Sequence, residues 1–138
     1  MPTNKTKNVF LKSNLRILEI GCGPGVAARE IANRIENGHI LAIDRSEKAI
    51  KLAIKNSKVE IESGILSFRH VAIEDFELEI NEKPFDIAFA VRVGALDGRH
   101  PKIGQLAFPR IAKALTENGK LFIDGGNPLK EISLEKYK

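Results

Sequence analysis

The feature that most constrains the fold is an apolar run that ends in alternating glycines and continues into a helical pattern. Residues 15–20 read Leu-Arg-Ile-Leu-Glu-Ile, which is typical of a strand buried in a parallel sheet. Glycines follow at positions 21, 23 and 25, and from Pro24 to Ile35 apolar residues recur at helical spacing. Because a strand that turns directly into a helix is the first half of a βαβ unit, the sequence predicts an α/β fold.

The same alternation continues along the chain. We predict further strands at 39–44, 65–71, 85–91 and 120–124, a helix from Ser46 to about residue 63, and another at about 103–115. The segment between the third and fourth strands is acidic and is predicted to be a loop or a short helix. Strands that alternate with helices form a parallel sheet with helices on both faces. We therefore expect a doubly wound sheet, which binds its ligands beyond the carboxyl ends of the strands.

Length and composition limit the organisation of the chain. Its 138 residues suit one domain with a single core, which we divide into a polar lead-in (1–13), a core (14–125) and a tail (126–138). The single cysteine excludes an internal disulfide, and no signal peptide or 18-residue apolar span is evident, so we expect a soluble cytoplasmic protein without a membrane partner. The net charge of +4 is spread thinly, which favours a solvated surface over a site for an acidic partner.

The glycine turn is a candidate binding site, because glycines let the backbone approach a ligand without interference from Cβ atoms. A plain turn is the alternative. A dinucleotide fingerprint requires a glycine at its sixth position, where this chain has Val26. Glu19 would face an anionic pyrophosphate, which is unfavourable in a partly desolvated cleft. S-adenosylmethionine has no phosphate and carries two cationic groups, so Glu19 favours it as the ligand.

A second acid supports a cofactor site. Asp44 ends the second predicted strand, about 20 residues past the glycines, where a carboxylate can accept hydrogen bonds from ribose hydroxyls. NAD-binding proteins share this feature, so it does not discriminate between the two cofactors. Alternatively, Glu19 is a solvated strand-end acid and Asp44 caps the helix that Ser46 opens. The joint occurrence of both acids around three glycines favours the cofactor site.

Residues 16–25, Arg-Ile-Leu-Glu-Ile-Gly-Cys-Gly-Pro-Gly, closely resemble the first motif of the class I S-adenosylmethionine-dependent methyltransferases. Residues 42–46 resemble the second-strand motif of that family, and residues 85–91 and 115–123 resemble its fourth strand and the approach to its fifth. The likeness covers about residues 14–125. With the predicted elements, it implies a Rossmann-like parallel sheet of five strands in the order 3-2-1-4-5, and methyl transfer that leaves S-adenosylhomocysteine as product.

The resemblance also implies roles for individual residues. Glu19 and the glycines would hold the methionine part of the cofactor, and Asp44 would hold the ribose. Arg45 and Ile73 would contact the adenine, with Glu74 or Asp75 nearby. Cys22 is read as an ordinary member of the turn, because no partner base is evident for a nucleophilic thiol. The cofactor-binding candidates are Glu19, Gly21, Cys22, Gly23, Gly25, Asp44, Arg45, Ala72, Ile73, Glu74, Ala90 and Val91.

Methyl transfer depends on the position of the nucleophile more than on acid–base groups. The segment 92–101 would border the methyl group and offers Asp97, Arg99 and His100 as candidate catalytic residues, with a plain polar loop as the alternative. His100 could act as a base, because imidazoles titrate near neutral pH. The motifs of DNA amino-methylating and cytosine C5 enzymes do not follow the fourth strand, which leaves small molecules, RNA or protein as acceptors. We expect no bound metal.

The tail departs from the family, in which a helix and an antiparallel strand pair follow. Only residues 126–138 remain after Gly125, so we expect the fifth strand to form an edge unless the tail, a second copy or another chain covers it. The first hypothesis is a methyltransferase acting on a small molecule. The second is a non-catalytic module that binds the cofactor or a partner. The third, an NAD-dependent oxidoreductase, rests on fold analogy and is disfavoured by Glu19 and Val26.

Overall fold

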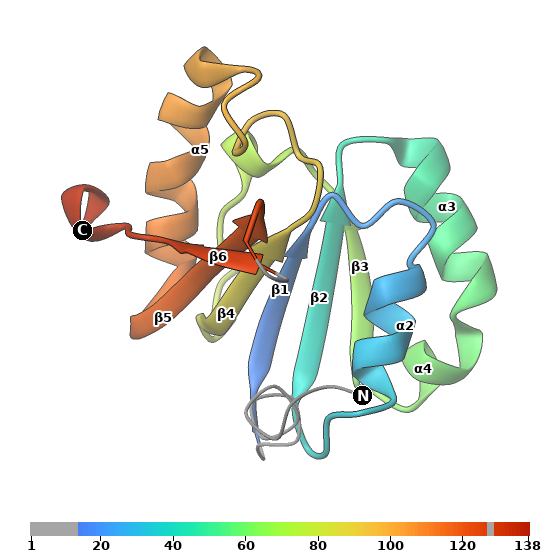
Figure 1. Cartoon of the computed structure of the whole chain (residues 1–138). Helices are drawn as coiled ribbons and strands as arrows, with labels where there is room; N and C mark the ends of the chain where they lie inside the picture. Colours follow the sequence, from blue (N-terminus) through green and yellow to red (C-terminus); the bar gives the residue numbers. More distant parts are fainter. Residues whose placement is uncertain (1–13, 127–128) are drawn as a thin grey trace.

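A sheet of six strands forms the centre of the protein (Figure 1). The computed structural model describes residues 14–126 and 129–138, so the predicted lead-in, residues 1–13, lies outside the described residues. The strand order is β3-β2-β1-β4-β5-β6, in which the first five strands are parallel and β6 is antiparallel to β5. The strands are β1 (Arg16–Ile20), β2 (His39–Asp44), β3 (Leu66–His70), β4 (Phe85–Ala90), β5 (Leu115–Asp124) and β6 (Leu129–Ile132).

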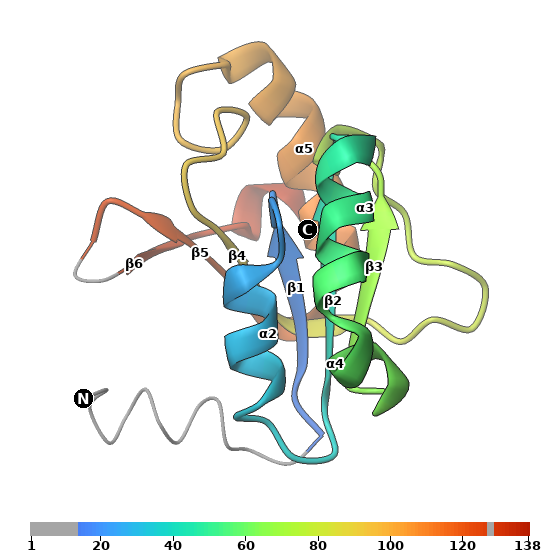
Figure 2. The same ribbon diagram turned by 90° about the vertical axis from the view of Figure 1, so that its right-hand side faces the viewer.

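Helices cover both faces of the sheet (Figures 1 and 2). On one face, α2 (Val26–Ala32) and α3 (Glu47–Asn56) bury Ala28 and Ile50 against Ile17 of β1. On the other face, α5 (Pro101–Ala114) buries Ile111 against Leu18. Neighbouring residues of β1 thus enter opposite cores, as the period of two in a strand requires. The remaining elements are α4 (Lys58–Glu62) and two short 3₁₀ helices, η1 (Ile73–Asp75) and η2 (Glu135–Tyr137).

The predicted fold class is confirmed: the five parallel strands occur in the order 3-2-1-4-5, with helices on both faces. Two predicted helices differ in length. The first ends at Ala32 rather than near Ile35, and the second is interrupted at Ser57. Ser57 is fully buried, and its hydroxyl accepts a hydrogen bond from the Arg29 guanidinium at 3.0 Å. Within the described residues, no helix is both long and apolar enough to cross a membrane.

The tail adds a strand that the sequence did not predict. β6 pairs with the outer side of β5, with Ile132 opposite Leu121. Ile132 packs against the core beneath α5, Leu134 is buried, and the Tyr137 ring stacks on Phe108 with 5.5 Å between ring centroids. Burial of these apolar side chains stabilises the tail on the sheet. The tail therefore covers residues 121–124 of β5, which is one of the alternatives that the expectation named, and a second copy or a partner chain cannot pair with that part of the edge.

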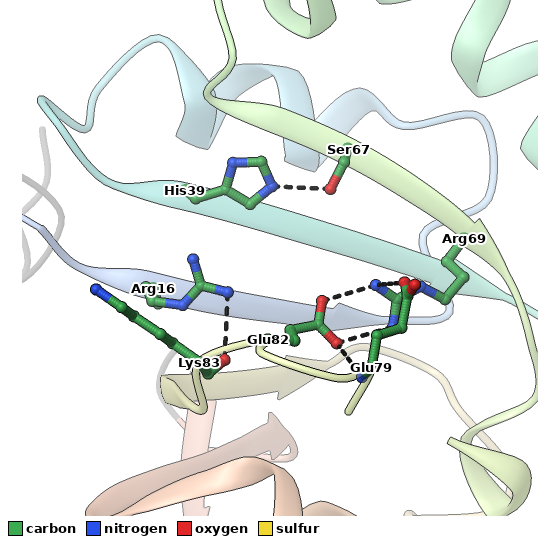
Figure 3. Close-up of polar contacts among 7 residues, drawn as sticks. All are labelled: Arg16, His39, Ser67, Arg69, Glu79, Glu82 and Lys83. Carbon is green, nitrogen blue, oxygen red and sulfur yellow. Dashed lines mark hydrogen bonds and ion pairs between the residues drawn. The ribbon is translucent and has the colours of Figure 1, made fainter. Parts of the chain in front are cut away.

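An ion pair anchors the acidic segment 71–84, which links β3 to β4 (Figure 3). The Arg69 guanidinium donates to both carboxylate oxygens of Glu82, at 3.2 and 2.7 Å, and lies over the Phe76 ring at the edge of the core. Burial alone would raise the pKa of Glu82, but hydrogen bonds from Arg69 and from the Glu79 N–H outweigh it and lower that pKa. This bidentate ion pair holds the segment against the sheet.

We expect Arg69→Met to lower the free energy of unfolding at pH 7 by about 1–2 kcal/mol, because Glu82 would be left half-buried without its partner. Urea denaturation measures the change. Lys51→Met is the control, since it removes an exposed helical pair with Glu47 and should cost less than about 0.5 kcal/mol. Equal losses in the two variants would contradict the anchoring role of Arg69.

Candidate functional site

A cavity of about 310 Å³ opens at the carboxyl ends of β1, β2 and β4. Ile20 and Gly21 form its wall on the β1 side, Asp44 lies at the end of β2, and residues 91–95 follow β4. The strand order reverses beside β1, which is the point where doubly wound sheets bind ligands. The volume lies at the lower end of the range for small-molecule sites. This cavity is therefore the candidate site.

Several predicted site residues meet at the cavity. The cofactor-binding candidates in its lining are Gly21, Asp44, Arg45, Ala72, Ile73, Glu74 and Val91. Of the predicted catalytic residues, Arg99 and His100 line it. The candidates that do not line it are Glu19, Cys22, Gly23, Gly25, Ala90 and Asp97. Arg92, Val93 and Ile103 also line the cavity but were not among the predicted site residues.

The glycine turn connects β1 to α2 through left-handed backbone. Gly21, Gly23 and Gly25 have φ angles of +76°, +53° and +88°, which other residues adopt only with strain. A Cβ atom on Gly21 would lie only 2.7 Å from the side chain of Val93, which is too close for two carbon atoms, and both residues line the cavity. A Cβ atom on Gly25 would lie 3.2 Å from Ala53 of α3. Gly21 thus keeps room beside the cavity, and Gly25 lets the turn pack closely on the neighbouring helix.

Asp44 links this turn to the cavity. Its Oδ2 accepts a hydrogen bond from the Gly23 N–H and its Oδ1 accepts one from the Ser46 N–H, each at 2.8 Å. The cap of α3 is Ser46, whose hydroxyl accepts from the Ala49 N–H, so Asp44 is not the side-chain cap of that helix. Each carboxylate oxygen has two lone pairs. Asp44 can therefore hold the turn and still accept a hydrogen bond from a ligand in the cavity.

Glu19 lies buried one residue before the cavity wall. Its side chain points toward the face that α2 and α3 cover, where its strand neighbours are Ala42 and Phe89, and it is 6% exposed. Burial, and then the negative charge of Asp44, raise the pKa of Glu19 to about 8, so the carboxyl is largely neutral at pH 7. Its Oε1 finds no hydrogen-bond partner among the described residues. The structure thus differs from the predicted ionised group facing the ligand.

Cys22 is a structural residue of the turn. The side chain is buried, and its Sγ lies 3.6 Å from the carbonyl oxygen of Gly23. Burial, followed by the negative charges of Glu19 and Asp44, raises the pKa of the Cys22 thiol to about 12. The thiol is therefore protonated at neutral pH and is a poor nucleophile.

Hydrogen bonds to the backbone of Arg92 hold the segment after β4 in place. Arg92 has a φ of +59°, its N–H donates to Asp124 of β5 at 3.1 Å, and its carbonyl accepts from the Arg99 guanidinium at 2.9 Å. Arg99 also donates to the Asp97 carboxylate at 2.9 and 3.0 Å, and this hydrogen bonding lowers the pKa of Asp97. Asp97 therefore orients Arg99 but does not line the cavity itself. Arg99 and His100 do line it.

The fold and the site define a class of protein: a doubly wound domain with a small-molecule cavity at the switch point of its sheet and an acid at the end of β2. A family model described as "Methyltransferase domain" matches residues 11–137, which is most of the chain. The chain belongs to this methyltransferase domain family.

Similar proteins agree with this assignment. The chain is 33% identical over 78 residues to a release factor glutamine methyltransferase of Flavobacterium psychrophilum, covering 52% of this chain and 27% of the relative. It is 39% identical over 71 residues to a tRNA1(Val) (adenine(37)-N6)-methyltransferase of Pedobacter heparinus, covering 51% and 29%. Both matches span less than a third of the relative's length.

A solved structure shares the fold. Phosphoethanolamine N-methyltransferase 2 of Haemonchus contortus, in complex with phosphomonomethylethanolamine and S-adenosylhomocysteine, superposes with a TM-score of 0.65 and 27% identity. The superposition covers 82% of this chain and 24% of that one.

Proposed function

We propose that this chain binds S-adenosylmethionine in the cavity beside β1 and transfers its methyl group to a small-molecule acceptor. The observation that carries the proposal is the position of Asp44, whose carboxylate lines the cavity at the end of β2. The methyltransferase names of the relatives and the S-adenosylhomocysteine complex of the similar structure support it. Because those names include protein, RNA and small-molecule acceptors, the choice of a small molecule rests on the size of the cavity, about 310 Å³.

The residues of the cavity fit a cationic nucleoside without phosphate. Asp44 would accept hydrogen bonds from the ribose hydroxyls, and Ile73 and Arg45 would lie against the adenine. The acids Asp44 and Glu74 lie in the wall. Opposite charge and free acceptors favour a cationic ligand over a pyrophosphate.

The chain contributes position and electrostatics to the reaction. When bound, S-adenosylmethionine supplies a methyl group and keeps the electrons of the broken S–C bond on sulfur. The acceptor provides the electron pair of the new bond, and any proton that it releases passes to water or to His100. Val93, Ala95 and Ile103 line the same part of the cavity and exclude water from the acceptor. A cytoplasmic location is part of this proposal, since the cofactor is made inside cells.

Calorimetry with S-adenosylhomocysteine and with NAD tests the cofactor. We expect S-adenosylhomocysteine to bind with one site per chain and NAD to give no measurable heat, because the Asp44 and Glu74 carboxylates in the cavity wall repel a pyrophosphate. Transfer of radiolabelled methyl groups to a metabolite extract then tests catalysis. Binding without transfer would support the non-catalytic module instead, and failure of S-adenosylhomocysteine to bind would overturn the proposed function.

A further inference from the structure

We propose that the acceptor is a small organic anion whose charged group is bound by Arg92 and Arg99 at the β4 side of the cavity. The inference rests on the proposed function and deepens it, since it names the chemical class of the acceptor. It is carried by the distribution of charge around the cavity, by the Arg92 guanidinium, which has no partner among the described residues, and by the apolar side chains that line the cavity.

The carboxylates in the cavity lining lie on one side of the cavity, and two of its three arginines lie on the other. Asp44 and Glu74 enter it from the ends of β2 and β3, beside Arg45. Arg92 and Arg99 enter it from the segment between β4 and α5. The carboxylates suit the cationic cofactor, which leaves the side of Arg92 and Arg99 for a second ligand. An anionic acceptor would match that side and would also be attracted by the positive sulfonium beside it.

Arg92 is the residue best placed to bind such a group. Its N–H and carbonyl are both held, by Asp124 and Arg99, so the backbone that carries the side chain is fixed. Its guanidinium forms no hydrogen bond or ion pair with any other described residue, and the side chain is exposed at the cavity. An arginine in left-handed backbone is uncommon, and such strained residues cluster at functional sites. A planar guanidinium can bind a carboxylate or a phosphate through two parallel hydrogen bonds.

The two acids near this side of the cavity already have hydrogen-bond partners. Asp97 is engaged by Arg99, and Asp124 accepts from the backbone of Arg92. Arg99 is thereby oriented with one terminal nitrogen, Nη1, without a partner among the described residues. The first turn of α5, which begins at this point, contains no acidic residue. One charged guanidinium and a spare donor of another therefore remain available.

Apolar side chains also line the cavity. They are Val91, Val93, Ala95 and Ile103, which come from the segment after β4 and from α5. A ligand that fills this part of the cavity would bury a hydrocarbon or aromatic body there and extend its anionic group to Arg92. A nucleic acid is disfavoured, because binding of its backbone needs several aligned cationic side chains, whereas the basic groups of this chain are spread thinly.

Matched pairs of probes test the binding of the anion. With S-adenosylhomocysteine at saturation, we expect benzoate or phenyl phosphate to bind at least about tenfold more tightly than benzamide or phenol. Comparison of the affinities for benzoate and for phenyl phosphate then shows whether the site prefers a carboxylate or a phosphate. Arg92→Gln should lower the affinity for the anion about tenfold, and Arg92→Lys should recover part of it. Arg34→Gln removes an exposed arginine that does not line the cavity and should leave anion affinity within about twofold.

The acceptor itself can be sought by fractionation. A metabolite extract is separated by anion exchange before the reaction, and each fraction is offered as acceptor with radiolabelled S-adenosylmethionine. We expect labelling in the retained, anionic fraction, reduced about tenfold or more by Arg92→Gln. Labelling confined to unretained compounds or to RNA would overturn the inference while leaving the proposed function intact. A loss of S-adenosylhomocysteine affinity in Arg92→Gln, with anion binding unchanged, would also overturn it, because the arginine would then hold the cofactor. Absence of S-adenosylhomocysteine binding to the wild-type chain would instead refute the proposed function.

Discussion

Replacement of Asp44 by alanine is expected to weaken the binding of S-adenosylhomocysteine by about 1–3 kcal/mol, which is roughly 5- to 150-fold. The ligand would lose the acceptor for its ribose hydroxyls. In addition, the N–H groups of Gly23 and Ser46 would lose the partner that fixes the glycine turn. Calorimetry at pH 7 measures the change in affinity, and urea denaturation reports the accompanying loss of stability.

Asp86→Ala is the matched control for this variant. Asp86 also accepts a hydrogen bond from a backbone N–H, that of Arg16 at 2.9 Å, but it lies near the start of β4 and does not line the cavity. Its replacement should lower stability by a similar amount and leave cofactor affinity unchanged. If both variants bind S-adenosylhomocysteine as tightly as the wild type, Asp44 is not a ligand of the ribose.

Glu19 is expected to make folding stability fall as the pH rises. Its pKa in the folded chain is about 8, above the ordinary value of 4.5, because burial disfavours the charged form. The folded state therefore holds a proton that the unfolded state releases above about pH 4.5. Its contribution is fully present below that pH and is lost progressively up to about pH 8. Between pH 4.5 and 7 the loss amounts to about 3 kcal/mol.

Glu19→Gln tests this expectation, because the amide has nearly the same shape and does not ionise. Urea denaturation at pH 5, 6, 7 and 8 should show the wild type losing stability relative to the variant as the pH rises. His39, whose pKa is lowered by burial, titrates in the same range with the opposite sign, but it is common to both proteins and cancels in the difference. Glu62→Gln, at an exposed position in α4, is the control and should run parallel to the wild type. Parallel curves for Glu19→Gln as well would mean that Glu19 is ionised in the folded protein.

Much of the site follows from local sequence. Gly21, Asp44 and Val91 each end or follow a strand that could be located from its apolar residues. Since parallel strands bring their carboxyl ends to one edge of the sheet, these positions meet at the cavity as predicted. These positions are far apart along the chain, but the topology of a doubly wound sheet fixes which strand ends are neighbours.

The environment of each side chain could not be predicted in the same way. Arg92 was not predicted as a site residue, because its sequence context gives no sign that Asp124 and Arg99 hold its backbone. Those partners come from the end of β5 and from the loop before α5. Likewise, Asp97 was expected at the site, whereas its carboxylate is engaged by Arg99 two residues away.

The sequence by itself located the five parallel strands and the edge of the sheet at which a ligand binds, because apolar periodicity and glycine turns are local signals, and the resemblance to the methyltransferase family supplied the strand order. Only the tertiary structure decided that residues 129–132 cover β5, and that Glu19 is buried and protonated rather than facing the ligand. Burial and pKa depend on which distant residues pack around a group. For Glu19 those are Ala42 and Phe89, brought beside it by the register of β2 and β4.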